Sequence, residues 1–284
     1  MKKARISFIY LLLLILSLGL VQAQDVISAK ELPNYLKQDN TILVCAQKAV
    51  DYNKIHITGA INIDHNLLYD DMTMLLPANE VAQMLGKNGV NQDMKIVLYD
   101  EGSSKYSGRM YWILTYMGAK DVKILDGGLE AWKAARKPVT RTATVAKATT
   151  FTPTPNAAYV ATTEEVKKAV NNPAYIIIDA RTPEEYNGTN ETDLRLGHIP
   201  SAVNINYTNV LEANGNLKSN EALAALYAKA GVTKDKTVII YCKTSVRAGI
   251  KFLALKSALN FPKVKVYDGA FLEWQNNNSN KVSM

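Results

Sequence analysis

An internal repeat is the feature of this sequence that most constrains its fold. Residues 26–46 align with residues 160–180 at a constant offset of 134, and from residue 56 onward matching positions lie 142 apart, because the second copy has gained eight residues near 187–194. Pairs at the second offset are His56 with His198, Asn62 with Asn204, Asp126 with Asp268, and Trp132 with Trp274. A duplicated unit of this length predicts two domains of one fold.

The repeat divides the 284 residues into four parts. We predict a signal peptide at residues 1–23, a first domain at 24–140, a linker at 141–158 and a second domain at 159–284. The linker is rich in Thr, Ala and Pro and has no apolar periodicity, which is typical of a connecting segment.

The first 23 residues have the order of a secretory signal. Basic residues at 2, 3 and 5 precede an apolar run at 6–21, and Val21-Gln22-Ala23 supplies the small-residue spacing of a cleavage site. A membrane anchor is the alternative, but the run is shorter than the roughly 20 residues that span a bilayer. We therefore expect a periplasmic or secreted protein.

Charge and composition exclude other classes. A chain with 48% hydrophobic and 21% charged residues is typical of a folded soluble protein, and no apolar run after residue 25 could span a membrane. The net charge of +7 falls to +4 when three of the 33 basic residues leave with the signal, against 26 acidic residues. Without a dense basic patch, this excess does not indicate nucleic-acid binding.

Short apolar runs alternate with helical stretches in each copy, which predicts an α/β fold with a mainly parallel sheet and helices on both faces. Ligands of such sheets bind beyond the carboxyl ends of the strands. Asp100 follows the run 95–99 and Cys242 follows the run 237–241. The repeat therefore places Asp100 and Cys242 at equivalent site mouths.

Cys242 is the candidate nucleophile. A polar loop follows it, with a helix expected near Ala248, and backbone N–H groups and helix dipoles in such a place lower the pKa of a thiol. The loop contains two cations and consists of Lys243, Thr244, Ser245, Val246 and Arg247. The other cysteine, Cys45, closes an apolar run and is expected to be a buried strand residue, with a single disulfide as the alternative.

With these motifs the chain resembles the two-domain rhodanese-type sulfurtransferases that use thiosulfate or 3-mercaptopyruvate. The resemblance covers residues 26–274 and rests on Asp179-Ala180-Arg181, Gly197-His198-Ile199-Pro200, the Cys242 loop, and Asp268-Gly269 before Trp274. It implies an inactive first domain, in which Asp100 cannot carry sulfur, and a catalytic second domain with its cysteine in a cleft between the two.

The resemblance also implies a reaction. Cys242 would take a sulfane sulfur from an anionic small-molecule donor, with thiosulfate favoured, and pass it to a thiophilic acceptor such as cyanide or a thiol. Residues 243–247 would bind the donor and the persulfide. Arg181 would either bind the donor or brace the domain with Asp179. No metal or organic cofactor is implied, and a monomer is expected because duplication already supplies both domains.

Three alternatives remain. A cysteine-dependent phosphatase would place five residues between its Cys and Arg, whereas four separate Cys242 from Arg247. A mercaptopyruvate-type enzyme usually begins this loop Cys-Gly-Ser/Thr-Gly, and Ser245 stands where many relatives have glycine, which raises the question of a positive φ there. A sulfur carrier or docking module with negligible turnover would keep the fold and the cysteine.

Other repeated residues are expected to serve the fold. His56 and His198 are both retained although only one copy has the nucleophile, and Trp132 and Trp274 are expected to be core anchors. Arg195, in the inserted stretch, is interpreted as an exposed loop charge, with donor binding as the alternative.

Overall fold

The computed structural model describes residues 25–190 and 194–284. The predicted signal peptide and part of the inserted stretch, residues 191–193, lie outside the described residues. No helix in the described residues is long and apolar enough to cross a membrane.

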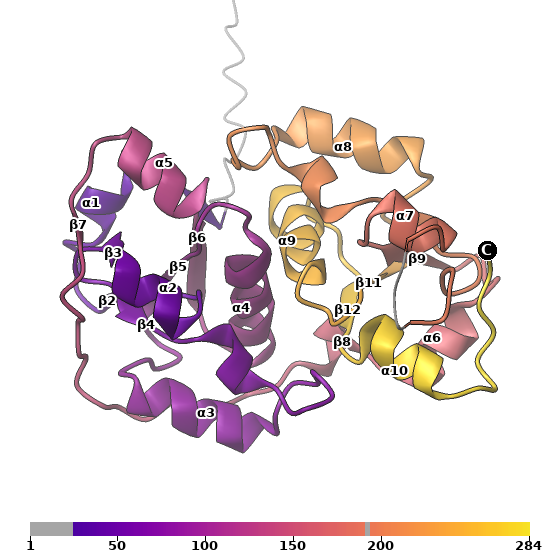
Figure 1. Ribbon diagram of the computed structural model, residues 1–284, viewed down its shortest axis with the longest axis horizontal. Helices are drawn as coiled ribbons and strands as arrows, with labels where there is room; N and C mark the ends of the chain where they lie inside the picture. The colour runs from indigo at the N-terminus through magenta and orange to yellow at the C-terminus, as the bar shows by residue number, and fades with distance from the viewer. Residues whose placement is uncertain (1–24, 191–193) are drawn as a thin grey trace, which may run out of the picture.

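Each copy folds around a five-stranded parallel sheet, as the sequence predicted (Figure 1). The strand orders are β1-β6-β5-β2-β4 and β8-β12-β11-β9-β10, so equivalent strands occupy equivalent places. The first sheet contains β1 (Val26–Ile27), β2 (Thr41–Cys45), β4 (Ile61–Asn62), β5 (Lys95–Tyr99) and β6 (Asp121–Leu125). The second contains β8 (Val160–Ala161), β9 (Tyr175–Asp179), β10 (Val203–Asn204), β11 (Thr237–Tyr241) and β12 (Val264–Tyr267). A short antiparallel pair joins β3 (His56–Ile57) to β7 (Val139–Thr140).

Helices cover both faces of each sheet. Those of the first domain are α1 (Leu32–Tyr35), α2 (Ala49–Lys54), α3 (Ala78–Lys87), α4 (Lys105–Tyr116) and α5 (Gly128–Ala134). Those of the second are α6 (Thr163–Ala169), α7 (Pro183–Asn187), α8 (Asn220–Lys229), α9 (Ala248–Leu253) and α10 (Ala270–Asn276). The faces under α3 and α4 and under α8 and α9 share one continuous hydrophobic core, while the outer faces have separate cores. The two domains are therefore joined through their interiors.

The predicted helix starts near Ser28 and Thr162 form similar hydrogen bonds, but the helices that follow begin at different positions. Thr162 Oγ1 accepts the Glu165 N–H at 3.2 Å and caps α6. Ser28 Oγ accepts the Glu31 N–H at 3.3 Å in the same way, yet α1 begins only at Leu32. Pro33 explains the difference, because it has no N–H to continue a helix begun earlier.

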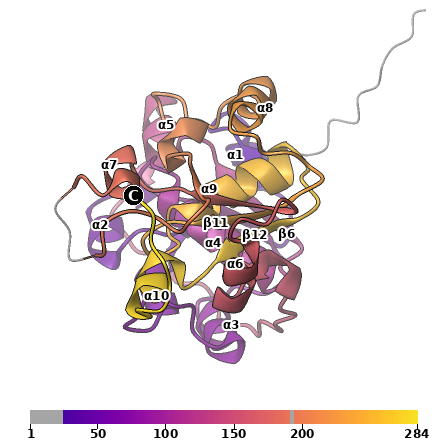
Figure 2. The same cartoon turned by 90° about the vertical axis from the view of Figure 1, so that its right-hand side faces the viewer.

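Two glycines let the domains meet at α4 and α9, which lie side by side in both views (Figure 1, Figure 2). A Cβ atom on Gly249 would overlap the backbone of Gly108, and a Cβ on Gly108 would overlap the backbone of Ile250. Only glycine permits this close approach of the two backbones.

Matching aspartates cross the interface in opposite directions. Asp268 Oδ2 accepts the Leu75 N–H at 2.8 Å, and Asp126 Oδ1 accepts the Leu217 N–H at 2.7 Å. Both donor and acceptor pairs differ by the repeat offset of 142. The duplicated Asp-Gly motif thus holds the two copies together with approximate twofold symmetry.

The offset of 142 predicted from residue 56 onward is wrong over one stretch. Ser104 and Ser245 both have positive φ, 54° and 60°, and they lie 141 apart. Ser104 comes directly before α4, and Ser245 comes three residues before the start of α9 at Ala248. A π-turn at Ala254–Ala258 follows α9 and accommodates the residue that restores the offset.

The segment 141–158 packs on the first domain and is not a free connection. The Thr149 N–H donates to Gly86 O and the Thr154 N–H to Met117 O, both at 2.9 Å. Phe151 is buried in the shared core. Residues 141–156 form no helix or strand of their own, and the segment is bound to α3 and to the end of α4.

Lys251 is the one fully buried lysine among the described residues. Its Nζ has no hydrogen-bond partner and lies 5.5 Å from the ring centroid of Tyr227, whose hydroxyl is also buried without a partner. Burial lowers the pKa of Lys251 well below its ordinary value. The fold therefore favours the neutral amine.

We predict that Lys251→Met stabilises the protein by about 2 kcal/mol at pH 7, because it removes a buried group without a partner. The depressed pKa also makes wild-type stability rise with pH, from the lowered pKa of Lys251 up to about 10.4, the ordinary lysine value. Lys251→Met should flatten that rise. Urea unfolding across this pH range checks both effects.

The matched control is Lys229→Met on α8, where the lysine is exposed and its removal should change stability little. Equal effects of the two substitutions would contradict the prediction.

Candidate active site

Cys242 lies where the sequence predicted, directly after β11 at the carboxyl end of a strand flanked by β9 and β12. Cys242 is 1% exposed, and its thiol forms no disulfide. The Phe271 N–H donates to Cys242 O at 3.0 Å, and the Leu272 N–H donates to Lys243 O at 3.1 Å. These bonds fix the start of the loop against α10.

The loop leaves its backbone donors unused. Within the described residues, the N–H groups of Lys243 to Arg247 donate to no protein acceptor, although Ser245 O accepts the Ala248 N–H at 3.1 Å. Successive free N–H groups after a strand attract an anion. They are available to a charged sulfur on Cys242 or to a donor's oxygens.

The first copy shows this loop with its donors occupied. Asp100 Oδ1 accepts the N–H groups of Gly102 and Ser104 at 3.0 and 3.1 Å. Asp100 Oδ2 accepts those of Tyr106 and Ser107, both at 3.0 Å, and the Ser107 hydroxyl at 3.1 Å. A carboxylate at the base of the loop thus satisfies donors that the second copy leaves free.

Ser245 has the positive φ that is typical of glycine, the residue that many relatives have at this position. Its φ is 60°, and its buried hydroxyl lies 2.6 Å from Tyr267 O and 2.7 Å from Asp268 O. The hydroxyl proton can be shared between these carbonyls. The bond to the end of β12 accompanies a backbone conformation that is costly for a non-glycine residue.

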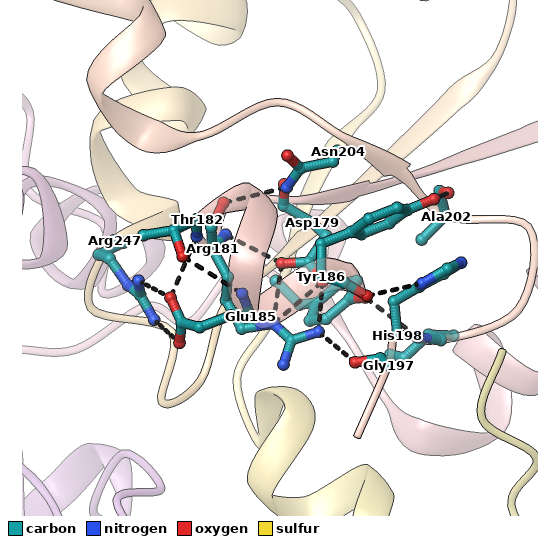
Figure 3. A network of polar contacts seen from close by, with 12 residues as sticks. Asp179, Arg181, Thr182, Glu185, Tyr186, Gly197, His198, Ala202, Asn204 and Arg247 are labelled. Carbon is teal, nitrogen blue, oxygen red and sulfur yellow. Dashed lines mark hydrogen bonds and ion pairs between the residues drawn. The ribbon is translucent and has the colours of Figure 1, made fainter. Parts of the chain in front are cut away.

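Arg247 is held by a carboxylate from another element. Its Nη1 donates to Glu185 Oε2 at 2.5 Å and its Nη2 to Glu185 Oε1 at 2.8 Å (Figure 3). Burial opposes the Arg247 charge, but Glu185 and the nearby Cys242 outweigh it and raise the pKa of Arg247 above its ordinary value. Although burial opposes the carboxylate, Arg247 holds the pKa of Glu185 below its ordinary value.

Glu185 is itself fixed by a capping box at the start of α7. The Glu185 N–H donates to Thr182 Oγ1 at 3.3 Å, and the Thr182 N–H donates to Glu185 Oε2 at 3.0 Å. One carboxylate oxygen therefore serves both the helix start and the Arg247 pair (Figure 3).

Arg181 forms the bracing contacts that were one of its two predicted roles. Its Nε and Nη2 donate to Asp179 at 3.0 and 2.6 Å, and Nη2 also donates to Gly197 O at 2.8 Å (Figure 3). Its guanidinium lies 4.0 Å from the Phe271 ring centroid, and the residue is 1% exposed. Burial opposes its charge, but Asp179 raises the pKa of Arg181. Donor binding by Arg181 stays a prediction.

The remaining loop side chains differ in exposure. Lys243 is exposed and forms no ion pair in the part of the chain that the structure describes, whereas Thr244 and Val246 are partly buried. Lys243 is therefore the loop cation that solvent and a small anion reach freely.

Comparison with known proteins identifies this arrangement. The family model described as "Rhodanese-like domain" matches residues 28–135 and 162–277. The chain belongs to the rhodanese family.

Relatives of this rhodanese include a sulfur carrier protein, TtuD, from Thermus thermophilus, 31% identical over 79% of this chain and 84% of the relative. A protein from Haloferax volcanii, named as a candidate thiosulfate sulfurtransferase, is 31% identical over 79% of this chain and 82% of the relative. Among solved structures, the 3-mercaptopyruvate sulfurtransferase SseA from Escherichia coli matches with a TM-score of 0.79 and 31% identity, over 86% of this chain and 98% of SseA. An anaerobic ergothioneine biosynthesis enzyme from Chlorobium limicola, TM-score 0.82 over 93% of this chain and 71% of that enzyme, shares the fold at 22% identity.

Two residues near the rhodanese loop escaped the sequence analysis as partners. Glu185 was given no role from the sequence, although Thr182 three residues earlier signals its capping box. Arg109 on α4 is fully buried and pairs with Asp268 at 2.5 Å across the domain interface. Since Ser245 bonds Asp268 O, Arg109 links the first domain to the base of the catalytic-type loop. No sequence signal connects positions so far apart.

The other cysteine and the repeated aromatic residues of this rhodanese serve the fold, as predicted. Cys45 is buried at the end of β2 as a free thiol, and burial raises its pKa to about 11. His56 stacks on Tyr52, and His198 stacks on Tyr186, with ring centroids 3.7 Å apart in both copies.

Both repeated tryptophans are core anchors. Trp132 and Trp274 are 3% and 2% exposed, and each indole N–H donates to a backbone carbonyl at 2.9 Å. Arg195 is not the exposed loop charge that was expected, because it is partly buried and its Nη1 donates to Asn280 O at 2.9 Å.

We predict that Ser245→Ala is about 1 kcal/mol less stable than Ser245→Gly. Both variants lose the bonds to Tyr267 and Asp268, but only alanine keeps the cost of the positive φ. Urea unfolding of both variants beside the wild type checks this. Equal stability of the two variants would show that the φ of 60° carries no cost.

Proposed function

We propose that this rhodanese is a sulfurtransferase that carries sulfane sulfur as a persulfide on Cys242, with thiosulfate as the favoured donor. The single observation that supports it most is the loop of unused N–H groups after Cys242, beside the same loop closed on Asp100 in the first domain. A loop that surrounds one anion in one copy suits a charged sulfur in the other.

The reaction is a double displacement. The Cys242 thiolate attacks the outer sulfur of thiosulfate, a sulfur–sulfur bond to Cys242 forms, and the original sulfur–sulfur bond breaks with its electron pair leaving on sulfite. Cyanide or a thiolate then attacks the outer sulfur of the persulfide, and the electron pair of the breaking bond returns to Cys242 as thiolate. Each step moves one sulfur atom and needs no external oxidant or reductant.

Each loop residue has a proposed role. The N–H groups of residues 243–247 stabilise the negative persulfide, and Lys243 attracts the donor anion because its charge is exposed and unpaired among the described residues. Arg247 contributes less charge than its position suggests, since Glu185 neutralises it. Ser245 maintains the loop shape.

Two other roles have specific support. The sulfur carrier name of the Thermus thermophilus relative favours a carrier that loads sulfur without rapid turnover. The likeness to SseA favours 3-mercaptopyruvate as donor. We place thiosulfate ahead of 3-mercaptopyruvate because this loop begins Cys-Lys-Thr-Ser and not Cys-Gly-Ser/Thr-Gly. We also propose export to the periplasm or outside, and action as a monomer.

We predict that the wild type forms thiocyanate from thiosulfate and cyanide over many turnovers, and that Cys242→Ser does not, because serine cannot hold sulfane sulfur. Mass spectrometry after thiosulfate treatment should find one added sulfur on Cys242. A single loading without turnover would support the carrier role, and sulfur on Cys45 would overturn the site.

We predict that Lys243→Gln raises the KM for thiosulfate about fivefold and weakens its dependence on ionic strength, because it removes the exposed loop charge. Lys168→Gln, an exposed lysine on α6, is the control and should change neither. A KM that is unaffected by Lys243→Gln would leave donor attraction to the N–H groups alone.

A further inference from the structure

The Glu185–Arg247 pair belongs to the second domain alone. The equivalent of Glu185 in the first domain is Asp51, which pairs with Lys54 of its own helix at 2.8 Å. The equivalent of Arg247, two residues after the serine of positive φ, is Tyr106, which stacks on His65 at 4.1 Å. The first domain folds the same way without this pair, so the fold does not require it.

Two arginines described at the mouth of the second domain, Arg181 and Arg247, each have an acidic partner. Arg181 is bound by Asp179 and Arg247 by Glu185, both through two or more donors. Side-chain exposure is 19% for Arg247 and 16% for Glu185, so the pair is only partly screened by water. Lys243 remains as the loop cation without an ion pair in the described part of the chain.

Arg247 interacts with two groups at the mouth of the second domain, Glu185 and Cys242. Its Nη1 and Nη2 donate to Glu185, and Cys242 is close enough to contribute to its raised pKa. A guanidinium carries five N–H donors, so the pair with Glu185 leaves others for sulfur or a donor oxygen. Its charge, however, is shared with the carboxylate.

We infer that Glu185 is a positioning residue that limits the positive charge Arg247 presents to the anionic donor and to Cys242. This inference rests on the proposed function. The limit has a chemical use, because sulfite must leave and an anionic acceptor must enter at the same mouth. A site that held anions more tightly would load faster at low thiosulfate but release more slowly.

Glu185→Gln in the full-length protein tests the inference. Glutamine can keep the capping box with Thr182 and one bond to Arg247 while removing the negative charge. The expected result is a KM for thiosulfate about fivefold lower than that of the wild type, the size expected for one partly exposed ion-pair charge. If Glu185 served only to hold the loop, the substitution would raise KM or lower kcat.

Glu184→Gln is the matched control, because Glu184 is exposed on the same helix and forms no ion pair among the described residues. It removes the same charge from α7 and should leave KM within twofold of the wild type. A double-mutant cycle with Arg247→Gln separates direct repulsion from action through Arg247. Glu185→Gln should have no further effect on KM in the Arg247→Gln protein, and an undiminished effect there would overturn the inference.

Alkylation of Cys242 by iodoacetamide, followed by mass spectrometry across pH, gives a readout that needs no sulfur transfer. The midpoint of the rate profile should move to lower pH in Glu185→Gln and stay unchanged in Glu184→Gln. If the midpoint shifts in Glu185→Gln but the wild type shows no turnover, the proposed function is overturned and this inference stands. Turnover with no shift in midpoint or KM would overturn the inference alone. If the buried Cys242 resists alkylation in every protein, an unchanged KM in Glu185→Gln would by itself overturn the inference.

If Glu185→Gln fails to fold, Glu185→Asp keeps the charge and shortens its reach. It should free Arg247 in part and lower KM by less than the roughly fivefold expected for Glu185→Gln, while thermal stability falls slightly. A raised KM in a folded Glu185→Asp protein would count against the inference.

Discussion

Backbone N–H groups that a loop turns inward must find an acceptor, and this requirement organises both domains. In each sheet, the loop after the central strand carries several such donors close in sequence to the residue at its base. In the first domain that residue is Asp100, and its carboxylate accepts from four N–H groups and a hydroxyl. In the second domain the residue is Cys242, and the donors of residues 243–247 stay free. The same kind of loop thus satisfies its own donors in the first copy and leaves them free in the second.

The interface supports the open loop from the far side. Gly108 and Gly249 bring α4 and α9 together, and Arg109 reaches from α4 to Asp268 at the end of β12. Asp268 also accepts the Leu75 N–H, and its carbonyl oxygen lies beside the Ser245 hydroxyl. The positive φ of Ser245 is therefore held by contacts that include the first domain. A single copy of the unit would lack Arg109 and Leu75, which gives the first domain a physical role in shaping the Cys242 loop.

Sequence predicted the fold and the base of the site because those depend on local pattern. Apolar runs gave the strands, the repeat gave two equal sheets, and the ends of β5 and β11 gave Asp100 and Cys242. The charge balance was harder to foresee. Arg247 was expected to face the donor, but its partner Glu185 lies 62 residues earlier on a helix of five residues. The pairing of two side chains from separate elements follows from packing, and neither periodicity nor spacing encodes it.

The loops after β5 and β11 differ in charge at two matched positions. Asp100 and Glu101 in the first domain correspond to Cys242 and Lys243 in the second. Burial and the neighbouring Asp100 raise the pKa of Glu101, as expected where two acidic groups share one loop. An anionic donor would be repelled from that mouth and attracted to the other by Lys243. Both loops follow equivalent central strands, so these two adjacent substitutions, together with the one-residue shift between Ser104 and Ser245, distinguish a loop closed on its own carboxylate from a loop with free donors.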